Sequence, residues 1–239
     1  MKPVEVIEEI KEIAAFCMFK GWAEKNAGNL SYRLEEKMLF NWLVSNKEFK
    51  IKKSLEMDNF ILDENFTILI SNSGVKFRDI VEDPLAHFSA VYLQNGVLNI
   101  HCSDEFSSPS SEFRTHLLIH QYLLKEQSPN NTIIHTHPTH LIAFSHKHYL
   151  HSKNKLNRIL ESTIPEIEKY IPKKTGFVDL YPAGSDALAE ESLKEIQNHE
   201  VVVWKKHGCI AIGDNFWNTI DKIDLLDKAA QIALLAGIE

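Results

Sequence analysis

Two short β-rich runs joined by an Asn-Gly pair constrain the fold of this chain more than any other feature. They lie in HFSAVYLQNGVLNIH (87–101), with Asn95 and Gly96 between them. Asn-Gly is the strongest short signal for a β-hairpin, because both residues tolerate the positive φ angles of a type I′ turn. Further along, VVVW (201–204) and GCIAIG (208–213) can form a second hairpin. Since the strands of a hairpin are antiparallel, the sequence predicts a mostly antiparallel sheet.

Segments with helical periodicity separate these strands and can cover the sheet. Gly21 is placed to end the first helix, and Ser110 or Ser111 can cap another at its start. Residues 35–63 are charged and irregular, and we expect loops or a short helix there. Apolar residues recur at helical spacing, or follow a helix-start signal, in 4–20, 112–124, 138–146, 185–200 and 215–237.

No long linker or internal repeat divides the chain. Hairpins mixed with helices are typical of an α/β domain in which helices pack on the faces of one sheet. We therefore expect a single domain over 1–239, with a mostly antiparallel central sheet covered by helices on both faces.

Composition and charge exclude several classes of protein. The formal net charge is −7, whereas nucleic-acid-binding proteins need a basic face to neutralise phosphates. No run of about 18 apolar residues is present, so we expect no membrane span. The N-terminal segment lacks the apolar centre of a signal peptide, and the three cysteines form no disulfide pattern, so we expect a cytoplasmic protein.

The stretch IIHTHPTH (133–140) is the first candidate for a functional site. Side chains two apart on a strand point to the same side, so His135 and His137 project together. Two imidazoles on a rigid strand are typical of zinc sites, although a pair of hydrogen-bonded histidines at a strand end fits the pattern equally well. His140 lies outside the alternation. A third ligand is offered by His207, directly after the apolar strand VVVW.

A second metal site is conceivable in PSSEFRTHLLIH (109–120). Glu112 lies in the first turn of the predicted helix, and His116 and His120 follow on roughly one face. Buried histidines among apolar neighbours are commonly structural, and a carboxylate at a helix N-terminus interacts favourably with the helix dipole. We therefore rank this site below the one at His135, His137 and His207.

Three short segments are suited to binding an anion. GNLS (28–31), SNSG (71–74) and PSSE (109–112) combine glycine or helix-start positions with hydroxyl and amide side chains. Backbone N–H groups in such turns can bind phosphate oxygens. None of the three is a Walker motif or a dinucleotide fingerprint.

Taken in order, GNLS, SNSG, PSSE, HTH and HG resemble the class II sugar-phosphate aldolases and epimerases, over about residues 20–235. The resemblance implies a three-layer α/β sandwich, zinc as the cofactor, and a small phosphorylated ketose as the substrate. It also implies site residues: His135, His137 and His207 as zinc ligands, Glu112 as catalytic acid/base, and Asn29, Ser71, Ser73, Gly74, Ser110 and Ser111 around the phosphate.

Within the family, the chain looks most like the aldolases that cleave L-rhamnulose 1-phosphate to dihydroxyacetone phosphate and L-lactaldehyde. That likeness implies a homotetramer in which a second glutamate comes from the adjacent subunit. Glu166 fits this position best, with Glu161 and Glu168 as alternatives, and Tyr170 could share its role. Cleavage of fuculose phosphate, 4-epimerisation of a pentulose phosphate and a non-catalytic scaffold are the competing interpretations.

Overall fold

The computed structural model describes residues 3–34, 41–42, 45, 49, 51–55, 67–94, 97–147 and 153–238. Its strands form one nine-stranded sheet in the order β2-β5-β4-β3-β1-β6-β9-β8-β7. Neighbouring strands pair antiparallel except β7 and β8, which are parallel, so the sheet is mixed and mostly antiparallel, as predicted. The strands are β1 (Asn29–Leu34), β2 (Ile51–Leu55), β3 (Thr67–Ser71), β4 (Phe88–Gln94), β5 (Val97–Cys102), β6 (Thr132–Thr136), β7 (Thr175–Val178), β8 (Val201–Trp204) and β9 (Gly208–Gly213).

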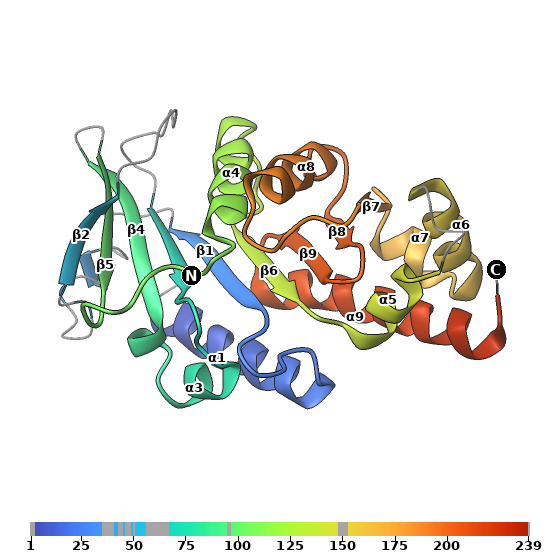
Figure 1. The fold of residues 1–239 in the computed structure, drawn as a ribbon, viewed down its shortest axis with the longest axis horizontal. Coiled ribbons are helices and arrows are strands. Elements are labelled where there is room, and N and C mark those ends of the chain that lie inside the picture. The colour runs from blue at the N-terminus through green and yellow to red at the C-terminus, as the bar shows by residue number, and fades with distance from the viewer. Residues whose placement is uncertain are drawn as a thin grey trace.

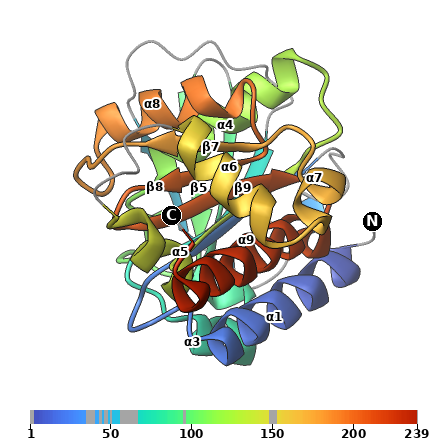
Figure 2. The same ribbon diagram turned by 90° about the vertical axis from the view of Figure 1, so that its right-hand side faces the viewer.

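Helices pack against both faces of this sheet (Figures 1 and 2). On β6, Ile133 joins an apolar cluster with residues of α4 and α8, whereas Ile134 joins one with residues of α1 and α9. Adjacent residues of a strand point to opposite faces, so the two clusters lie on opposite sides of the sheet. Within the described ranges, no helix is both long and apolar enough to span a bilayer. The helices are α1 (Pro3–Lys20), α3 (Phe77–Glu82), the 3₁₀ turn η1 (Leu85–His87), α4 (Phe113–Lys125), α5 (Thr139–Ser145), α6 (Lys153–Thr163), α7 (Glu166–Tyr170), α8 (Asp186–Ile196) and α9 (Phe216–Ala236).

Most of the predicted elements form, with local signals at their ends. Gly21 follows α1 with φ +70°, in the left-handed region that favours glycine. The Ser185 hydroxyl accepts a hydrogen bond from the Leu188 N–H at the start of α8. Both predicted hairpins are present: β8 pairs with β9, and Gln94 of β4 lies opposite Val97 of β5. The turn residues 95–96 lie outside the described residues.

Three parts of the chain differ from the sequence-based expectation. Ile51–Leu55, where loops or a short helix were expected, is the edge strand β2, because the edge of β5 supplies backbone partners. Helix α4 begins after Glu112, and no serine side chain caps it; the Ser110 hydroxyl instead accepts the Glu112 N–H at 3.2 Å. The polar region between α5 and β7 contains α6 and α7, for which no element was predicted.

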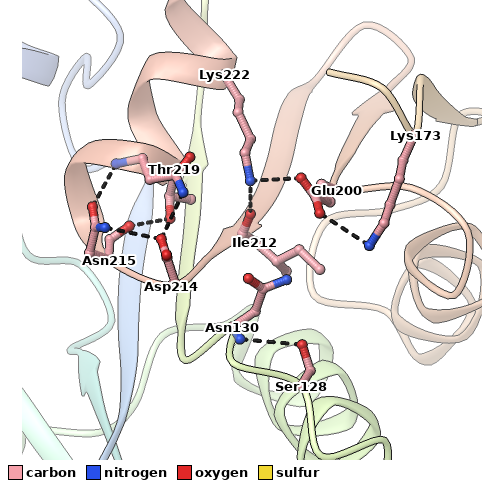
Figure 3. Close-up of polar contacts among 10 residues, drawn as sticks. Ser128, Asn130, Lys173, Glu200, Ile212, Asp214, Asn215, Thr219 and Lys222 are labelled. Atoms are coloured by element: carbon pink, nitrogen blue, oxygen red, sulfur yellow. Dashed lines mark hydrogen bonds and ion pairs between the residues drawn. The ribbon is translucent and has the colours of Figure 1, made fainter. Parts of the chain in front are cut away.

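A nearly buried lysine fixes α9 against the sheet (Figure 3). The Lys222 Nζ atom donates to the Ile212 carbonyl of β9 at 3.0 Å and pairs with Glu200 at 2.8 Å. The exposed Lys173 pairs with the other oxygen of Glu200 at 3.1 Å. Burial alone would raise the pKa of Glu200, but the bonds and charges of Lys222 and Lys173 outweigh it and lower the pKa. The carboxylate thus joins α9, the start of β8 and the loop before β7.

Replacing Glu200 with alanine should destabilise the protein by about 3 kcal/mol, because the Lys222 ammonium would remain in place without its counter-charge. Lys173→Ala is the matched control: its side chain is 59% exposed, so its removal should cost less than about 1 kcal/mol. Urea unfolding followed by circular dichroism measures both changes. Equal effects would show that burial of the Lys222–Glu200 pair is not what stabilises this junction.

Candidate active site

Three histidines meet beside the end of β6 and the start of β9. His135 lies on β6, His137 follows its end, and His207 stands in the turn between β8 and β9. Their candidate ligand atoms all lie within 4.8 Å of one another, and no other group of the kind occurs among the described His, Cys, Asp and Glu residues. The ring centroids are 5.0–5.2 Å apart. The structure therefore brings together the histidines of the first-ranked site.

Hydrogen bonds orient two of these rings. The His135 Nδ1–H donates to the Cys209 carbonyl at 2.9 Å, and the His137 Nδ1–H donates to the Glu24 carboxylate at 2.7 Å. Each bond fixes the tautomer and leaves Nε2 with a free lone pair. Metal-binding histidines commonly donate their second N–H to a carbonyl or carboxylate in this way.

The close approach of β9 to β6 requires a glycine after His207. A Cβ atom on Gly208 would lie 2.4 Å from the Thr136 carbonyl oxygen and 3.1 Å from the His137 ring. Real Cβ atoms do not approach backbone oxygens so closely, so any other residue would push the two strands apart. The pair His207-Gly208 thus places the third imidazole beside the first two.

Burial keeps the imidazoles ready to bind a metal. Desolvation lowers the pKa of His135 well below its usual value, and the neighbouring His137 and His207 lower it further. Desolvation likewise lowers the pKa of His207 to about 4. Both rings are therefore neutral at physiological pH, which is the form that coordinates metal ions.

Glu112, beside the histidines, is an almost fully buried carboxyl group. Its Oε1 accepts the Gly184 N–H at 3.0 Å, and its Oε2 has no hydrogen-bond partner in the described structure. Desolvation raises the pKa of Glu112 to about 7, although the Gly184 bond acts in the opposite direction. A carboxyl group with this pKa can both release and accept a proton near neutral pH.

A cavity of about 340 Å³ connects these groups to the anion-binding turns. Ser71 does not line it; its hydroxyl is buried and accepts the Leu30 N–H at 3.1 Å. The two serine-rich turns face each other, since the Ser110 N–H donates to the Ser71 carbonyl at 3.0 Å. The other predicted site residues at the cavity wall are Asn29, Ser73, Gly74, Ser110, Ser111, Glu112, His135, His137 and His207.

Several other candidates lie elsewhere or have a structural role. Glu166 and its alternatives lie on α6 and α7, and none of them lines the cavity. His116 and His120 do not form a metal cluster; their ring nitrogens bond to Ser31, and His116 also bonds to Asn29. His140 bonds to Asp227 through its Nδ1–H at 2.9 Å, in keeping with its exclusion from the ligand set.

Sequence reasoning missed Glu24, Asn72 and Gly184. Glu24 orients His137 from 113 positions away in the chain. Gly184 holds Glu112 across 72 positions, and Asn72 contributes to the cavity wall. None of these three residues belongs to a strand or helix pattern from which a place at the site could be predicted. Two signals were available in the sequence: Asn72 lies within SNSG, and position 184 is a glycine, which adopts φ +70° in the structure.

Comparison with known proteins agrees with this geometry. The family model of the class II aldolase and adducin N-terminal domain matches residues 8–234. The rhamnulose-1-phosphate aldolase of Bacteroides thetaiotaomicron is 28% identical over 235 residues, which cover 96% of this chain and 85% of that protein. A sugar-phosphate aldolase from Thermotoga maritima has a crystal structure with a TM-score of 0.81 and 27% identity, covering 98% of this chain and 97% of that one. An L-fuculose 1-phosphate aldolase, 18% identical, shares the fold with a TM-score of 0.66 and covers 99% and 88% of the two chains.

Because the family model spans nearly the whole chain, the protein belongs to the class II aldolase family, and it is a lyase of the aldolase type. This confirms the family resemblance. Members of this class depend on a metal ion, and the three histidines could bind one. A second relative of closely similar identity is again a rhamnulose-1-phosphate aldolase, that of Listeria welshimeri, which is 27% identical over 229 residues and covers 95% of this chain and 81% of that protein.

The raised pKa of Glu112 makes a prediction about stability. A group whose pKa is higher in the folded than in the unfolded protein favours folding fully below its unfolded pKa, near 4.5, and loses that contribution as pH rises through about 7. Glu112→Gln, which cannot ionise, should therefore be more stable than the wild type by about 2 kcal/mol at pH 8.5. This advantage should vanish near pH 4.5. Urea unfolding of the metal-free proteins at both pH values measures it, and a constant difference would contradict the assignment.

Proposed function

We propose that this protein catalyses the reversible, zinc-dependent cleavage of L-rhamnulose 1-phosphate to dihydroxyacetone phosphate and L-lactaldehyde. One observation carries the proposal: a single cavity combines three clustered imidazoles, a buried carboxyl group with a free oxygen, and turns suited to phosphate. The curated relatives named above, which match along most of their length, support the choice of substrate.

The histidines suit a zinc ion. His135, His137 and His207 each offer one imidazole nitrogen, and three protein ligands with one open position are typical of catalytic zinc. When bound, the ion would act as a Lewis acid that stabilises the negative charge developing on the substrate oxygens as the carbon–carbon bond breaks.

Glu112 is suited to move the proton that the reaction requires. Its Oε1 is held by the Gly184 N–H, so the unpartnered Oε2 is the atom that delivers a proton to the substrate carbon after cleavage. In the direction of synthesis, the same oxygen removes that proton. A pKa of about 7 suits both directions, because a general acid/base works best when its pKa is near the working pH.

The two turns hold the end of the substrate that does not react. Asn29, Ser73 and Gly74, together with Ser110 and Ser111, line the part of the cavity in which we place the phosphate. Binding energy from this remote group fixes the reacting carbon relative to Glu112. Ser71 supports the turn through its bond to the Leu30 N–H and does not itself contact the cavity.

The proposal also covers the domain organisation, the localisation and the assembly of the protein. The continuous sheet supports one domain over 1–239, and the two apolar clusters on its faces support a three-layer sandwich. We include a cytoplasmic homotetramer, in which Glu166 of α7 would take the proton that the C4 hydroxyl of the neighbouring subunit's substrate loses as the aldehyde forms. Glu166 is exposed on a short helix, which is compatible with that role, and Glu161 is less suitable because it pairs with Lys174 at 2.9 Å.

The competing activities are cleavage of L-fuculose 1-phosphate, 4-epimerisation of a pentulose phosphate, and a non-catalytic scaffold. The structural likeness to an L-fuculose 1-phosphate aldolase supports the first of these. The scaffold is the weakest alternative, because a chain without catalytic function would have no reason to keep Glu112 buried without a partner for Oε2.

The substrate is tested by incubating the zinc-loaded protein with L-rhamnulose 1-phosphate, L-fuculose 1-phosphate and L-ribulose 5-phosphate, and measuring dihydroxyacetone phosphate. We expect the highest kcat/KM for L-rhamnulose 1-phosphate, loss of activity with a chelator, and recovery with zinc. A higher kcat/KM for L-fuculose 1-phosphate would instead identify the protein as an aldolase that acts on that substrate. Epimerised product without dihydroxyacetone phosphate, or no reaction at all, would exclude an aldolase of this specificity.

The roles of Glu112 and His207 are separated by one pair of variants. Glu112→Gln keeps the shape of the side chain but cannot transfer a proton, so it should retain one zinc per chain while kcat falls by about 100-fold or more. His207→Ala should lose zinc, because one of the three donors is gone. Metal content by mass spectrometry and the cleavage rate measure both. Near-normal turnover by Glu112→Gln, or full zinc content in His207→Ala, would contradict the assigned roles.

A further inference from the structure

A chain of buried hydrogen bonds runs beneath the cavity from α4 to Asn29. The Ser31 hydroxyl lies 2.8 Å from His120 Nε2 and 2.7 Å from His116 Nδ1. His116 Nε2 in turn lies 2.6 Å from Asn29 Oδ1. The side chains of Ser31, His116 and His120 are fully buried, and Asn29 reaches the cavity wall. The chain thus ends at a side chain of the site.

Both imidazoles in this chain are neutral. Burial lowers the pKa of His116 to about 3. Burial also lowers the pKa of His120, and the nearby positive charge of Arg33 opposes its protonation further. A neutral imidazole has one N–H donor and one acceptor nitrogen, so the direction of the chain depends on which ring nitrogen of each histidine carries the proton.

The unused nitrogen of His120 decides this direction. Its Nδ1 atom is buried and has no hydrogen-bond partner in the described structure. If His120 carried its proton there, a buried N–H would remain unsatisfied, which is rarer and more costly than an unused lone pair. The proton therefore lies on Nε2, which donates to the Ser31 oxygen, and the Ser31 O–H donates to His116 Nδ1.

The direction of the chain then fixes the amide of Asn29. Since His116 accepts at Nδ1, its proton lies on Nε2 and is donated to Asn29 Oδ1. His116 holds the carbonyl oxygen of the Asn29 amide, and the NH₂ group of the same amide has no hydrogen-bond partner among the described residues. Asn29 lines the cavity, so its unused NH₂ group is available there as a donor, which is the polarity that suits an anion.

Asn72, on the facing turn, shows the same arrangement. The buried Ser89 hydroxyl donates to Asn72 Oδ1 at 2.5 Å. The Asn72 Nδ2 atom is buried without a hydrogen-bond partner in the described structure, and the residue lines the same cavity. Unsatisfied buried donors are uncommon, and at a binding site they indicate a group that the ligand completes.

We propose that the His120–Ser31–His116 chain is a positioning device that presents the Asn29 NH₂ group to the substrate phosphate, with the Asn72 NH₂ group as a second donor. This inference rests on the proposed phosphate site. It adds His116, His120, Ser31 and Ser89 as positioning residues and Asn72 as a binding residue. The four positioning residues act through the two amides and do not touch the substrate.

The direction of the chain is tested by ¹⁵N NMR of metal-free protein labelled at histidine. The ring-nitrogen shifts distinguish the two tautomers, and a His116→Phe variant identifies the His116 signals. We expect His116 and His120 to be neutral with the proton on Nε2 at pH 7. A proton on Nδ1 of His116 would reverse the chain, turn the Asn29 carbonyl toward the cavity, and overturn the inference.

The consequence for binding is tested by titrating inorganic phosphate into the same metal-free proteins and following ³¹P NMR. His116→Phe releases the Asn29 amide, and Ser89→Ala releases the Asn72 amide with little risk to folding. Each should raise the phosphate Kd about tenfold, the value of one charge-assisted hydrogen bond. His140→Phe is the matched control and should bind as the wild type does, because His140 bonds to Asp227 away from the cavity.

The outcomes separate this inference from the proposed function. In the cleavage assay, Ser89→Ala should raise KM with little change in kcat or zinc content, which a general loss of structure would not do. Unchanged phosphate affinity in both His116→Phe and Ser89→Ala would overturn the inference even if the protein cleaves its substrate. Normal phosphate binding without cleavage of any ketose phosphate would count against the proposed function and leave the inference in place.

Discussion

The site depends on one feature of the sheet, which is that β6 is hydrogen-bonded between β1 and β9. In this register Asn29 lies opposite His135 on one side, and His135 lies opposite Ile210 on the other. Neighbouring strands are held about 4.8 Å apart, so three segments far apart in the chain deliver an amide, two imidazoles and the His207-Gly208 turn to one place. Gly208 permits this closeness because a Cβ would collide with the Thr136 carbonyl. The remaining parts of the site are attached to this three-stranded unit.

Burial gives the site its chemistry. Desolvation disfavours the charged form of a group, so it lowers the pKa of His135 and raises the pKa of Glu112. Most buried polar atoms of the site are bonded to protein groups, so their orientations are fixed. Two exceptions at the cavity wall are Glu112 Oε2 and Asn72 Nδ2. Unsatisfied groups reduce stability, and their presence in the cavity is what is expected where a substrate completes the hydrogen bonding.

Much of the fold could be predicted because its signals are local. Asn95-Gly96 and the apolar runs at 201–204 and 208–213 predicted two hairpins, and the flanking strands pair accordingly. The edge strand β2 could not be predicted, since its charged residues form a strand only because β5 offers an unpaired edge. In the site, the His135–His137 pair followed from strand alternation. Ser71 was assigned to the phosphate with its neighbours; in the structure its buried hydroxyl accepts the Leu30 N–H, and Ser71 is not among the residues that line the cavity.

The sequence by itself determined the family, the types of element and the chemical groups available: three histidines, a glutamate and three turns rich in hydroxyl and amide side chains. Those are properties of short segments, and each can be read within a few residues. Only the tertiary structure decided which histidines meet and which support them. His116 and His120 have the same chemistry as His135, but α4 directs them toward Ser31, whereas β6 directs His135 toward the cavity. The reason is physical: coordination, tautomer and pKa depend on what lies within a few ångströms of an atom, and in this fold those neighbours come from distant parts of the chain.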